Sequence, residues 1–364
     1  MSTSSGLRIA LALPGLHRVN RGAETAMERI AAGLANLGHV VTVFGSGPER
    51  AGAPYRYRRI FCVPRERFES WPQVPILRSH YAWEELTFSV GLAAIYRPGD
   101  YDVTMACSYP FINWVFRRGR PKHVFVTQNG DWAPQARNSE FRLFSCDGLV
   151  CTNSQYFARN RERFRSVLIP NGVDPDVFFP GAGDRAAYDL PADKSIALMV
   201  SALIPSKRVS DGVRAVAATE GMFLAVAGDG ECRTEVDELA AKLLPGRFRR
   251  FNLPREKMPG LYRCADLFLH MSVDEPSANA YMEALSTGLP IVTHDWEVTR
   301  WTLEDCGLMV DSHELELVTA ALQRALQLRR KEDEQARRAL VDRRFAWSHI
   351  SEAYSEFLHQ VLAG

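Results

Sequence analysis

Several features that mark particular classes of protein are missing from this chain of 364 residues. Its seven cysteines are an odd number and include no CxxC pair, so they offer neither a disulfide framework nor a zinc-finger spacing. We therefore expect buried thiols in a reducing compartment. The net charge is only +1, so the chain has no general attraction for nucleic acid, and we expect no nucleic-acid partner.

Long apolar runs are also missing. No segment approaches the ~20 apolar residues that span a bilayer, and the start MSTSSG lacks the basic region of a signal peptide, so Leu7–Leu13 is predicted to be a first strand. We expect a cytoplasmic protein. The basic residues Arg117, Arg118, Arg120 and Lys122 fit a solvated loop, but they also leave open a peripheral contact with the inner face of a membrane or with an acidic acceptor.

What the chain does contain is an alternation of short apolar runs with helical patterns, which predicts parallel sheets covered by helices. The strands expected in the first half are 7–13, 40–44, 103–107, 123–127, 149–152 and 167–169, and those in the second half are 196–200, 223–227, 248–252, 267–271, 291–293 and 308–310. The fold class is therefore α/β, with two Rossmann-like domains whose parallel sheets face each other across a deep cleft.

The boundary between the two domains is predicted in Pro170–Gly183, where proline, glycine, asparagine and aspartate are dense. We expect an N-terminal domain over residues 1–172 and a second domain over 173–344. Residues 345–364 have the pattern of an amphipathic helix, with Phe345 and Trp347 as its anchors, and we expect it to pack back toward the N-terminal domain. Ligands of open α/β sheets bind at the carboxyl ends of the strands.

Two carboxylates near that edge, Glu275 and Glu283, are the most informative pair in the sequence. If a turn holds the first and a helix the second, they lie on the order of 10 Å apart at ~1.5 Å per residue. That distance is about the reach of a nucleoside diphosphate from its ribose to the group on its far phosphate. One acid could hold ribose hydroxyls while the other faces the transferred group, although a surface helix with ordinary acids has the same pattern.

The turn before that helix also suits an anion. Ser277 is a plausible N-cap, and the free N–H groups of Ala278 and Asn279 would then point toward an anion at the strand edge. Lys207 and Arg208 follow the first strand of the second domain, where two cations would neutralise a diphosphate. A solvated surface pair is the more common fate of such a dipeptide.

Three further loops are weaker candidates. Gly22 stands between the first strand and the first helix, where backbone can approach an anion, but the loop is not a GxGxxG fingerprint. Backbone near Asn252 and Leu253 could face a nucleobase, and a plain strand-to-helix junction explains those residues nearly as well. Turn chemistry alone explains Gly228-Asp229-Gly230.

Taken in order, these motifs resemble those of the family-4 retaining glycosyltransferases of the GT-B fold, and the resemblance covers nearly the whole chain. The motifs that carry it are RGAE at 21–24, IPNGVD at 169–174, Lys207, AGDG at 227–230, LYRCADLFLHMS at 261–272, the Glu275/Glu283 pair, EALSTGLPIV at 283–292 and FAW at 345–347.

The resemblance implies a nucleotide-sugar donor held mainly by the second domain, an acceptor bound by the first, retention of the anomeric configuration and no metal requirement. It places Glu283 on the ribose hydroxyls, Glu275 on the donor sugar, Lys207 beside the leaving diphosphate and the Gly22 backbone near its outer phosphate. The donor is a substrate, so no cofactor is expected. The acceptor class stays open among a glycan, a lipid-linked sugar and a small molecule, and so does the oligomeric state.

The chain also departs from the family. Ala202 stands where an arginine is usual, and Arg208 is a candidate substitute. Asn129 stands in place of a first-domain histidine and can hydrogen-bond a sugar hydroxyl but cannot carry a proton at neutral pH. Asp131 is a second candidate for that role, although it also fits a plain turn acid. These departures keep two alternatives in view: a noncatalytic sugar-nucleotide-binding subunit, and a nucleotide-sugar epimerase.

Overall fold

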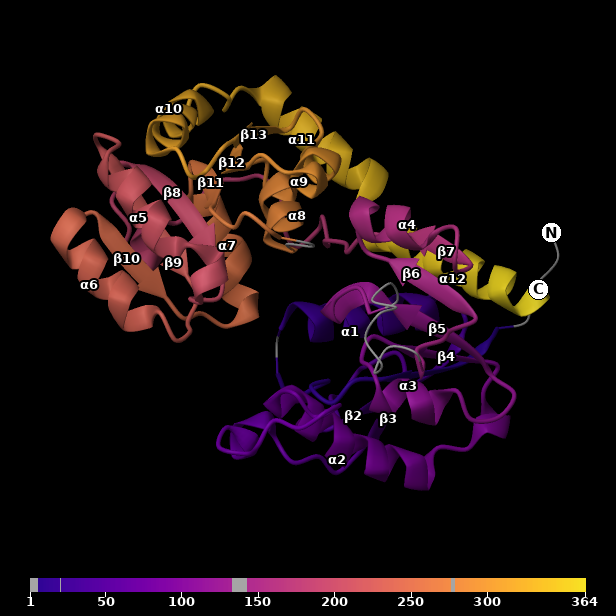
Figure 1. Cartoon of the computed structure of the whole chain (residues 1–364). Helices are drawn as coiled ribbons and strands as arrows, with labels where there is room; N and C mark the ends of the chain where they lie inside the picture. The colour runs from indigo at the N-terminus through magenta and orange to yellow at the C-terminus, as the bar shows by residue number, and fades with distance from the viewer. Residues whose placement is uncertain (1–5, 20, 133–142, 276–278) are drawn as a thin grey trace. The chain divides into compact units, whose positions relative to one another are not determined.

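The computed structural model describes residues 6–19, 21–132, 143–275 and 279–364, and the chain divides into two compact units. The first unit comprises residues up to Asn171 together with Trp347–Gly364, and the second is Gly172–Ala346. Each unit is a parallel sheet with helices on its faces (Figure 1). This confirms the predicted α/β class with two Rossmann-like domains.

The first unit has a seven-stranded sheet in the order β3-β2-β1-β4-β5-β6-β7, in which every neighbouring pair is parallel. Its strands are β1 (Arg8–Ala12), β2 (Val40–Gly45), β3 (Arg56–Arg59), β4 (Val103–Ala106), β5 (Lys122–Val126), β6 (Gly148–Cys151) and β7 (Ser166–Leu168). Its helices are α1 (Gly22–Asn36), α2 (His80–Ile95), α3 (Phe111–Phe116), α4 (Ser154–Asn160) and α12 (Trp347–Ala363).

The second unit has a six-stranded parallel sheet in the order β10-β9-β8-β11-β12-β13. Its strands are β8 (Ser195–Val200), β9 (Met222–Ala227), β10 (Phe248–Phe251), β11 (Leu267–His270), β12 (Ile291–His294) and β13 (Gly307–Val310). Its helices are α5 (Val209–Ala217), α6 (Arg233–Leu243), α7 (Met258–Cys264), α8 (Asn279–Ser286), α9 (Glu297–Leu303), α10 (Leu315–Ala325) and α11 (Lys331–Arg344).

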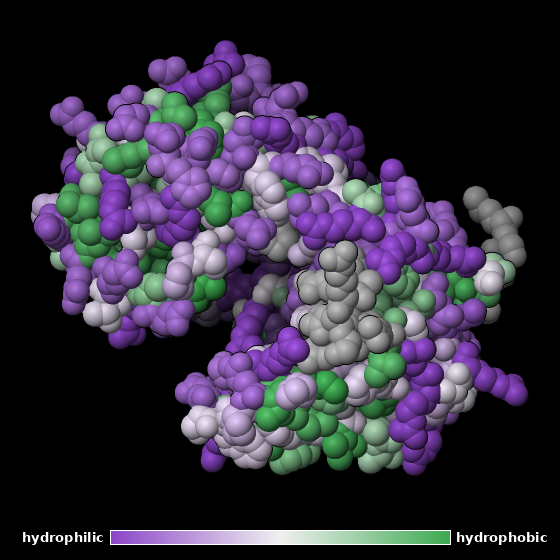
Figure 2. All heavy atoms as spheres, in the orientation of Figure 1, coloured by the Kyte–Doolittle hydropathy of each residue, from purple (hydrophilic) through white to green (hydrophobic). Residues whose placement is uncertain are grey.

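All twelve strands expected from apolar runs are present, but β3 was missed. Its sequence is RYRR, and its side chains are exposed or half-buried at the edge of the sheet. An edge strand pairs on one side only and needs no apolar face of its own, so it leaves no apolar run to recognise. Apolar side chains gather on the face of the first unit over α2 (Figure 2), and the exposed residues there include Val90.

The C-terminal helix α12 is part of the first unit. Its buried residues Tyr354, Phe357 and Leu358 share a core with Ile30 and Leu34 of α1, and the two helices lie side by side in Figure 1. The helix begins at Trp347, two residues later than expected. Phe345 is therefore not one of its anchors but a fully buried member of the core of the second unit, where its carbonyl accepts a hydrogen bond from the Val173 N–H at 2.7 Å.

Among the described residues, the structure contains no helix with both the length and the apolar character needed to cross a bilayer.

Candidate active site

The sheet of the second unit has a topological switch point between β8 and β11. From β8 the chain moves outward to β9 and β10, and from β11 it moves the other way to β12 and β13. At such a point the loops leaving two neighbouring strands separate, which opens a crevice at their carboxyl ends. The loop after β8 carries Lys207 and the loop after β11 carries Glu275.

The structure brings these two predicted residues together as an ion pair between the Lys207 ammonium and the Glu275 carboxylate. Their side chains are 22% and 9% exposed, so the pair is largely shielded from water yet reachable on the lysine side. The loops are also tied by Ser272, whose hydroxyl donates to the Ser206 carbonyl at 3.0 Å. A cation held by a fixed carboxylate is a preorganised partner for developing negative charge.

A buried histidine behind Glu275 was not predicted. The His270 Nε2 lies 3.6 Å from Glu275 Oε2, and its Nδ1 lies 3.0 Å from the Tyr281 hydroxyl. The same hydroxyl lies 2.6 Å from Thr293 Oγ1. Burial lowers the pKa of His270 to about 4, with Lys207 adding to the effect and Glu275 opposing it. The ring is therefore neutral at pH 7, and it connects the Glu275 carboxylate to the centre of the sheet.

Glu283 lies in α8 and is buried together with two partners that the sequence did not name. The Tyr262 hydroxyl donates to Glu283 Oε2 at 2.8 Å, and Arg255 Nη2 lies 3.6 Å from Glu283 Oε1. Burial raises the pKa of Glu283, while Arg255 and the Tyr262 hydroxyl lower it. A carboxylate in this position needs such partners, and they hold its oxygens in fixed directions.

The other predicted donor residues of this unit are placed as follows. Arg208 donates to Ser312 Oγ at 2.9 Å and pairs with Asp211 at 2.7 Å, so its guanidinium fastens the loop after β8 to neighbouring segments. Asn252 Nδ2 lies 3.5 Å from Asp229 Oδ2, and Leu253 is half-buried against the core. Asn279 is the first residue of α8. Ser277 and Ala278 lie outside the described residues.

The glycines of the AGDG turn serve close packing between two loops. A Cβ on Gly228 would lie 1.8 Å from the Ser201 carbonyl oxygen, and one on Gly230 would lie 2.4 Å from the Leu203 carbonyl oxygen. The Leu203 N–H donates to the Asp229 carbonyl at 3.0 Å. Any side chain at either glycine would therefore push the loop that carries Lys207 out of place.

Three predicted residues belong to the first unit. Gly22 is the first residue of α1, after Arg21 at the N-cap. Asn129 follows β5, and its amide donates to the Tyr81 hydroxyl at 3.2 Å. The Asp131 side chain is 4% exposed and accepts from the Asn160 amide at 3.0 Å, with Arg159 3.9 Å away, so that it ties the loop after β5 to α4.

Two family models together match most of the chain. The model described as Glycosyltransferase Family 4 matches residues 20–177, and the model described as Glycosyl transferases group 1 matches residues 183–341. Two parallel-sheet units with these matches define a glycosyltransferase of the GT-B fold. The chain belongs to glycosyltransferase family 4.

One curated relative is the lipopolysaccharide core biosynthesis glycosyltransferase LpsE of Rhizobium meliloti (strain 1021). It is 31% identical over 191 residues, which are 50% of this chain and 56% of that protein. The chain therefore spans about half the length of this curated relative.

Solved structures with low sequence identity share the fold over almost the whole chain. A sucrose-phosphate synthase from Thermosynechococcus elongatus superimposes with a TM-score of 0.80 at 20% identity, covering 98% of this chain and 99% of that one. The Anabaena protein HepE, solved in complex with UDP and glucose, gives a TM-score of 0.76 at 16% identity, with 97% and 99% covered.

Proposed function

We propose that the protein transfers a sugar from a nucleotide-sugar donor to an acceptor, with retention of the anomeric configuration and without a metal ion. The observation that carries the proposal is the Lys207–Glu275 ion pair at the switch point of the second unit, with Glu283 on the helix that follows. The HepE complex with UDP and glucose supports a nucleotide-sugar donor for a chain of this fold.

In the proposed reaction the bond between the anomeric carbon and the outer phosphate oxygen breaks, and an acceptor hydroxyl oxygen bonds to the anomeric carbon. Negative charge grows on the departing diphosphate, which takes up the proton of that hydroxyl. Lys207 stabilises that charge, and Glu283 holds the ribose hydroxyls at the other end of the donor. Glu275 orients the donor sugar, and the buried His270 ring beside Glu275 holds that carboxylate in place. A fixed cation stabilises the transition state more than the ground state, because the charge it faces is larger there.

The test is a donor panel of UDP-, GDP- and ADP-sugars, with hydrolysis and transfer followed by chromatography. We expect Lys207→Met to lower kcat by about 100-fold or more, as removal of one stabilising group does elsewhere. Lys242→Met is the matched control, because Lys242 is an exposed lysine of α6 in the same unit. Turnover that is unchanged in Lys207→Met would contradict the proposal.

NMR spectra of the same reactions, together with thermal-shift measurements, separate the remaining alternatives. A coupling constant at the anomeric carbon that is the same in donor and product shows retention, and activity that survives EDTA shows metal independence. Thermal stabilisation by a nucleotide sugar without any turnover would instead point to a noncatalytic binding subunit. An isomerised sugar nucleotide would point to an epimerase.

We also propose that the protein acts at the cytoplasmic face of a membrane, where it contacts the lipid peripherally. The support comes from one part of the first unit. Phe61 is 78% exposed and lies beside Gly91 of α2, and Val90 in the same helix is 66% exposed. The edge strand β3, which ends two residues before Phe61, carries three arginines. Apolar side chains flanked by cations suit an anionic bilayer surface. Sedimentation with anionic but not neutral vesicles, lost in Phe61→Ser, tests this.

A further inference from the structure

The first unit has its own topological switch point, and a set of charged side chains stands at it. Its sheet runs from β1 outward through β2 and β3 on one side and from β4 through β5, β6 and β7 on the other. The loop after β1 carries Arg18, and the loop after β4 carries Ser108. As in the second unit, ligands are expected where these two loops separate.

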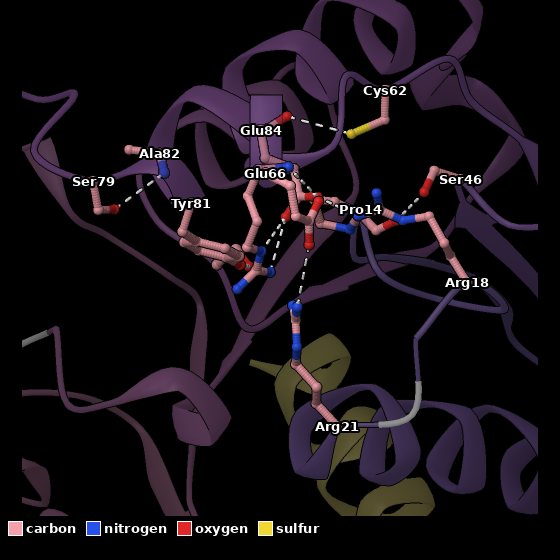
Figure 3. Close-up of polar contacts among 12 residues, drawn as sticks. Pro14, Arg18, Arg21, Ser46, Cys62, Glu66, Ser79, Tyr81, Ala82 and Glu84 are labelled. Atoms are coloured by element: carbon pink, nitrogen blue, oxygen red, sulfur yellow. Dashed lines mark hydrogen bonds and ion pairs between the residues drawn. The ribbon is translucent and has the colours of Figure 1, made fainter. Parts of the chain in front are cut away.

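Helix α2 contributes the carboxylate around which the cluster is built. Ser79 caps the helix by accepting from the Ala82 N–H at 3.2 Å, and this places Tyr81 and Glu84, three residues apart, on one face. Figure 3 shows both side chains projecting from α2, while Arg21 points from the start of α1 toward Glu66.

Glu84 is fully buried and binds two arginines at once. Arg18 contacts one of its oxygens through Nη2, and Arg65 contacts the other through Nη2 at 2.8 Å and also donates its backbone N–H at 3.2 Å. The side chains of Arg18 and Arg65 remain 22% and 23% exposed. The two guanidinium groups are therefore rigid, adjacent and reachable from solvent.

The positive charge of the two arginines exceeds the negative charge of Glu84. Two guanidinium groups against one carboxylate leave a net charge of +1. Of the other acids close by, Glu66 lies 3.8 Å from Arg21, and burial raises the pKa of Glu24 while Arg21 and Arg65 oppose that shift. In addition, Arg18 Nε is buried and has no hydrogen-bond partner among the described residues.

Neutral donors and acceptors surround this charge. The Arg65 guanidinium lies over the Tyr81 ring, 4.9 Å from its centroid, and the Tyr81 hydroxyl hydrogen-bonds Ser108 and accepts from Asn129. The N–H groups of two fixed guanidinium groups can bind the oxygens of a phosphate or a carboxylate, and the neighbouring hydroxyl and amide groups can bind the hydroxyls of a polyol that carries it.

We propose that Arg18 and Arg65, supported by Glu84 and accompanied by Tyr81, bind an oxyanion carried by the acceptor, so that the acceptor is a sugar or polyol bearing a phosphate or a carboxylate. The assignment of this ligand as the acceptor rests on the proposed glycosyltransferase activity, but the anion site itself does not. A buried Arg–Glu–Arg triad that only supports the fold is the competing explanation.

The test is direct binding to the full chain by titration calorimetry. The probes are inorganic phosphate, glucose 6-phosphate, glucuronate and, as the neutral control, glucose. The titrations are repeated in Lys207→Met, which removes the lysine proposed to face the donor diphosphate. We expect anionic probes to bind more tightly than glucose in both backgrounds, and the binding to weaken with salt. Preference for glucose 6-phosphate or for glucuronate then identifies the phosphate or the carboxylate as the group recognised.

The decisive variant is Arg18→Gln, since Arg18 makes fewer contacts with Glu84 than Arg65 does. Loss of a charged hydrogen-bonding pair should weaken anion binding by about 10- to 100-fold, while Arg8→Gln, which breaks an ion pair with Asp102 at the amino ends of β1 and β4, should leave it unchanged. Equal anion binding in Arg18→Gln and the unmodified chain, or no preference over glucose, overturns the proposal. Donor hydrolysis measured in parallel reports on the proposed function, so the two can fail separately.

Discussion

At the scale of single residues, burial shifts the pKa values of two side chains in opposite directions. His270 has its pKa lowered to about 4 by burial, and Glu85 has its pKa raised to about 8 by burial, against two backbone N–H groups of α3 that lower it. Both groups are therefore largely neutral at pH 7, but the stability linked to His270 falls as the pH decreases and the stability linked to Glu85 falls as the pH increases.

For His270 the loss comes with acid. Because its pKa in the folded state lies below the ordinary 6.5, the unfolded chain binds the proton first, and stability falls as the pH drops from 6.5 toward 4. The loss should reach about 3 kcal/mol at most. We expect His270→Asn to show a smaller fall in the same interval, as measured by urea unfolding at pH 7, 6, 5 and 4. Parallel curves for the two proteins would contradict the assignment.

For Glu85 the loss comes as the pH rises. Its folded pKa lies above the ordinary 4.5, so stability is full below pH 4.5 and falls as the pH rises toward 8. Glu85→Gln keeps an oxygen that can accept from the Ile112 N–H, a bond of 3.0 Å, and removes the ionisation. We expect the variant to melt several degrees higher at pH 8 and nearly alike at pH 5. A higher Tm at pH 5 that vanishes at pH 8 would reverse the predicted sign.

At the scale of elements, the packing of α12 against α1 depends on one glycine. A Cβ on Gly33 of α1 would lie 1.9 Å from Ser351 Oγ and 2.7 Å from Ser351 Cβ. Contacts that short are not relieved by turning the serine, because its Cβ is fixed to the helix. The two helices therefore approach each other as closely as they do only because position 33 has no side chain.

We expect Gly33→Ala to destabilise the first unit by about 1–3 kcal/mol, the range for overpacking, even though alanine favours helix by up to ~1 kcal/mol. Gly99→Ala is the control, since a Cβ there meets nothing within 4 Å. The measurement is hydrogen exchange of α12 amides. Protection that is unchanged in Gly33→Ala would show that the helices can separate at no cost.

How much of this could be read from the sequence depends on the kind of signal. Buried strands can be predicted because they are apolar runs, and Lys207 and Glu275 can be predicted because they stand in a recognisable order of motifs. His270 was not, because its contact with Glu275 needs the intervening turn to fold back. The Arg18–Glu84 contact joins residues 66 positions apart, and no local pattern in the sequence reports a pairing of that kind.

At the scale of the whole molecule, the chain crosses between its units twice, after Asn171 and after Ala346. At the second crossing the chain passes from one hydrophobic core to the other within two residues, because Phe345 packs in the core of the second unit and Trp347 packs against the core of the first. The first unit is thus built from two separate stretches of sequence, whereas the second is continuous.

A chain that ends at Ala346 tests this division. It should keep the second unit intact and expose the apolar residues of α1 that α12 covers, among them Ile30 and Leu34. We expect amide protection to be lost in α1 and retained in β8 and β9, as measured by hydrogen exchange and mass spectrometry. Equal loss in both units would mean that they unfold as one.

The discontinuity of the first unit also sets the order in which the polypeptide is finished during its synthesis. Ribosomes add roughly 5–20 residues per second, so α1 emerges tens of seconds before α12 can reach it. Throughout that interval the nascent chain carries an uncovered apolar helix, whereas the second unit has all of its residues as soon as Ala346 has been added. The portion translated first is consequently the last to mature, and a premature stop shortly after Ala346 would damage the beginning of the protein rather than its middle.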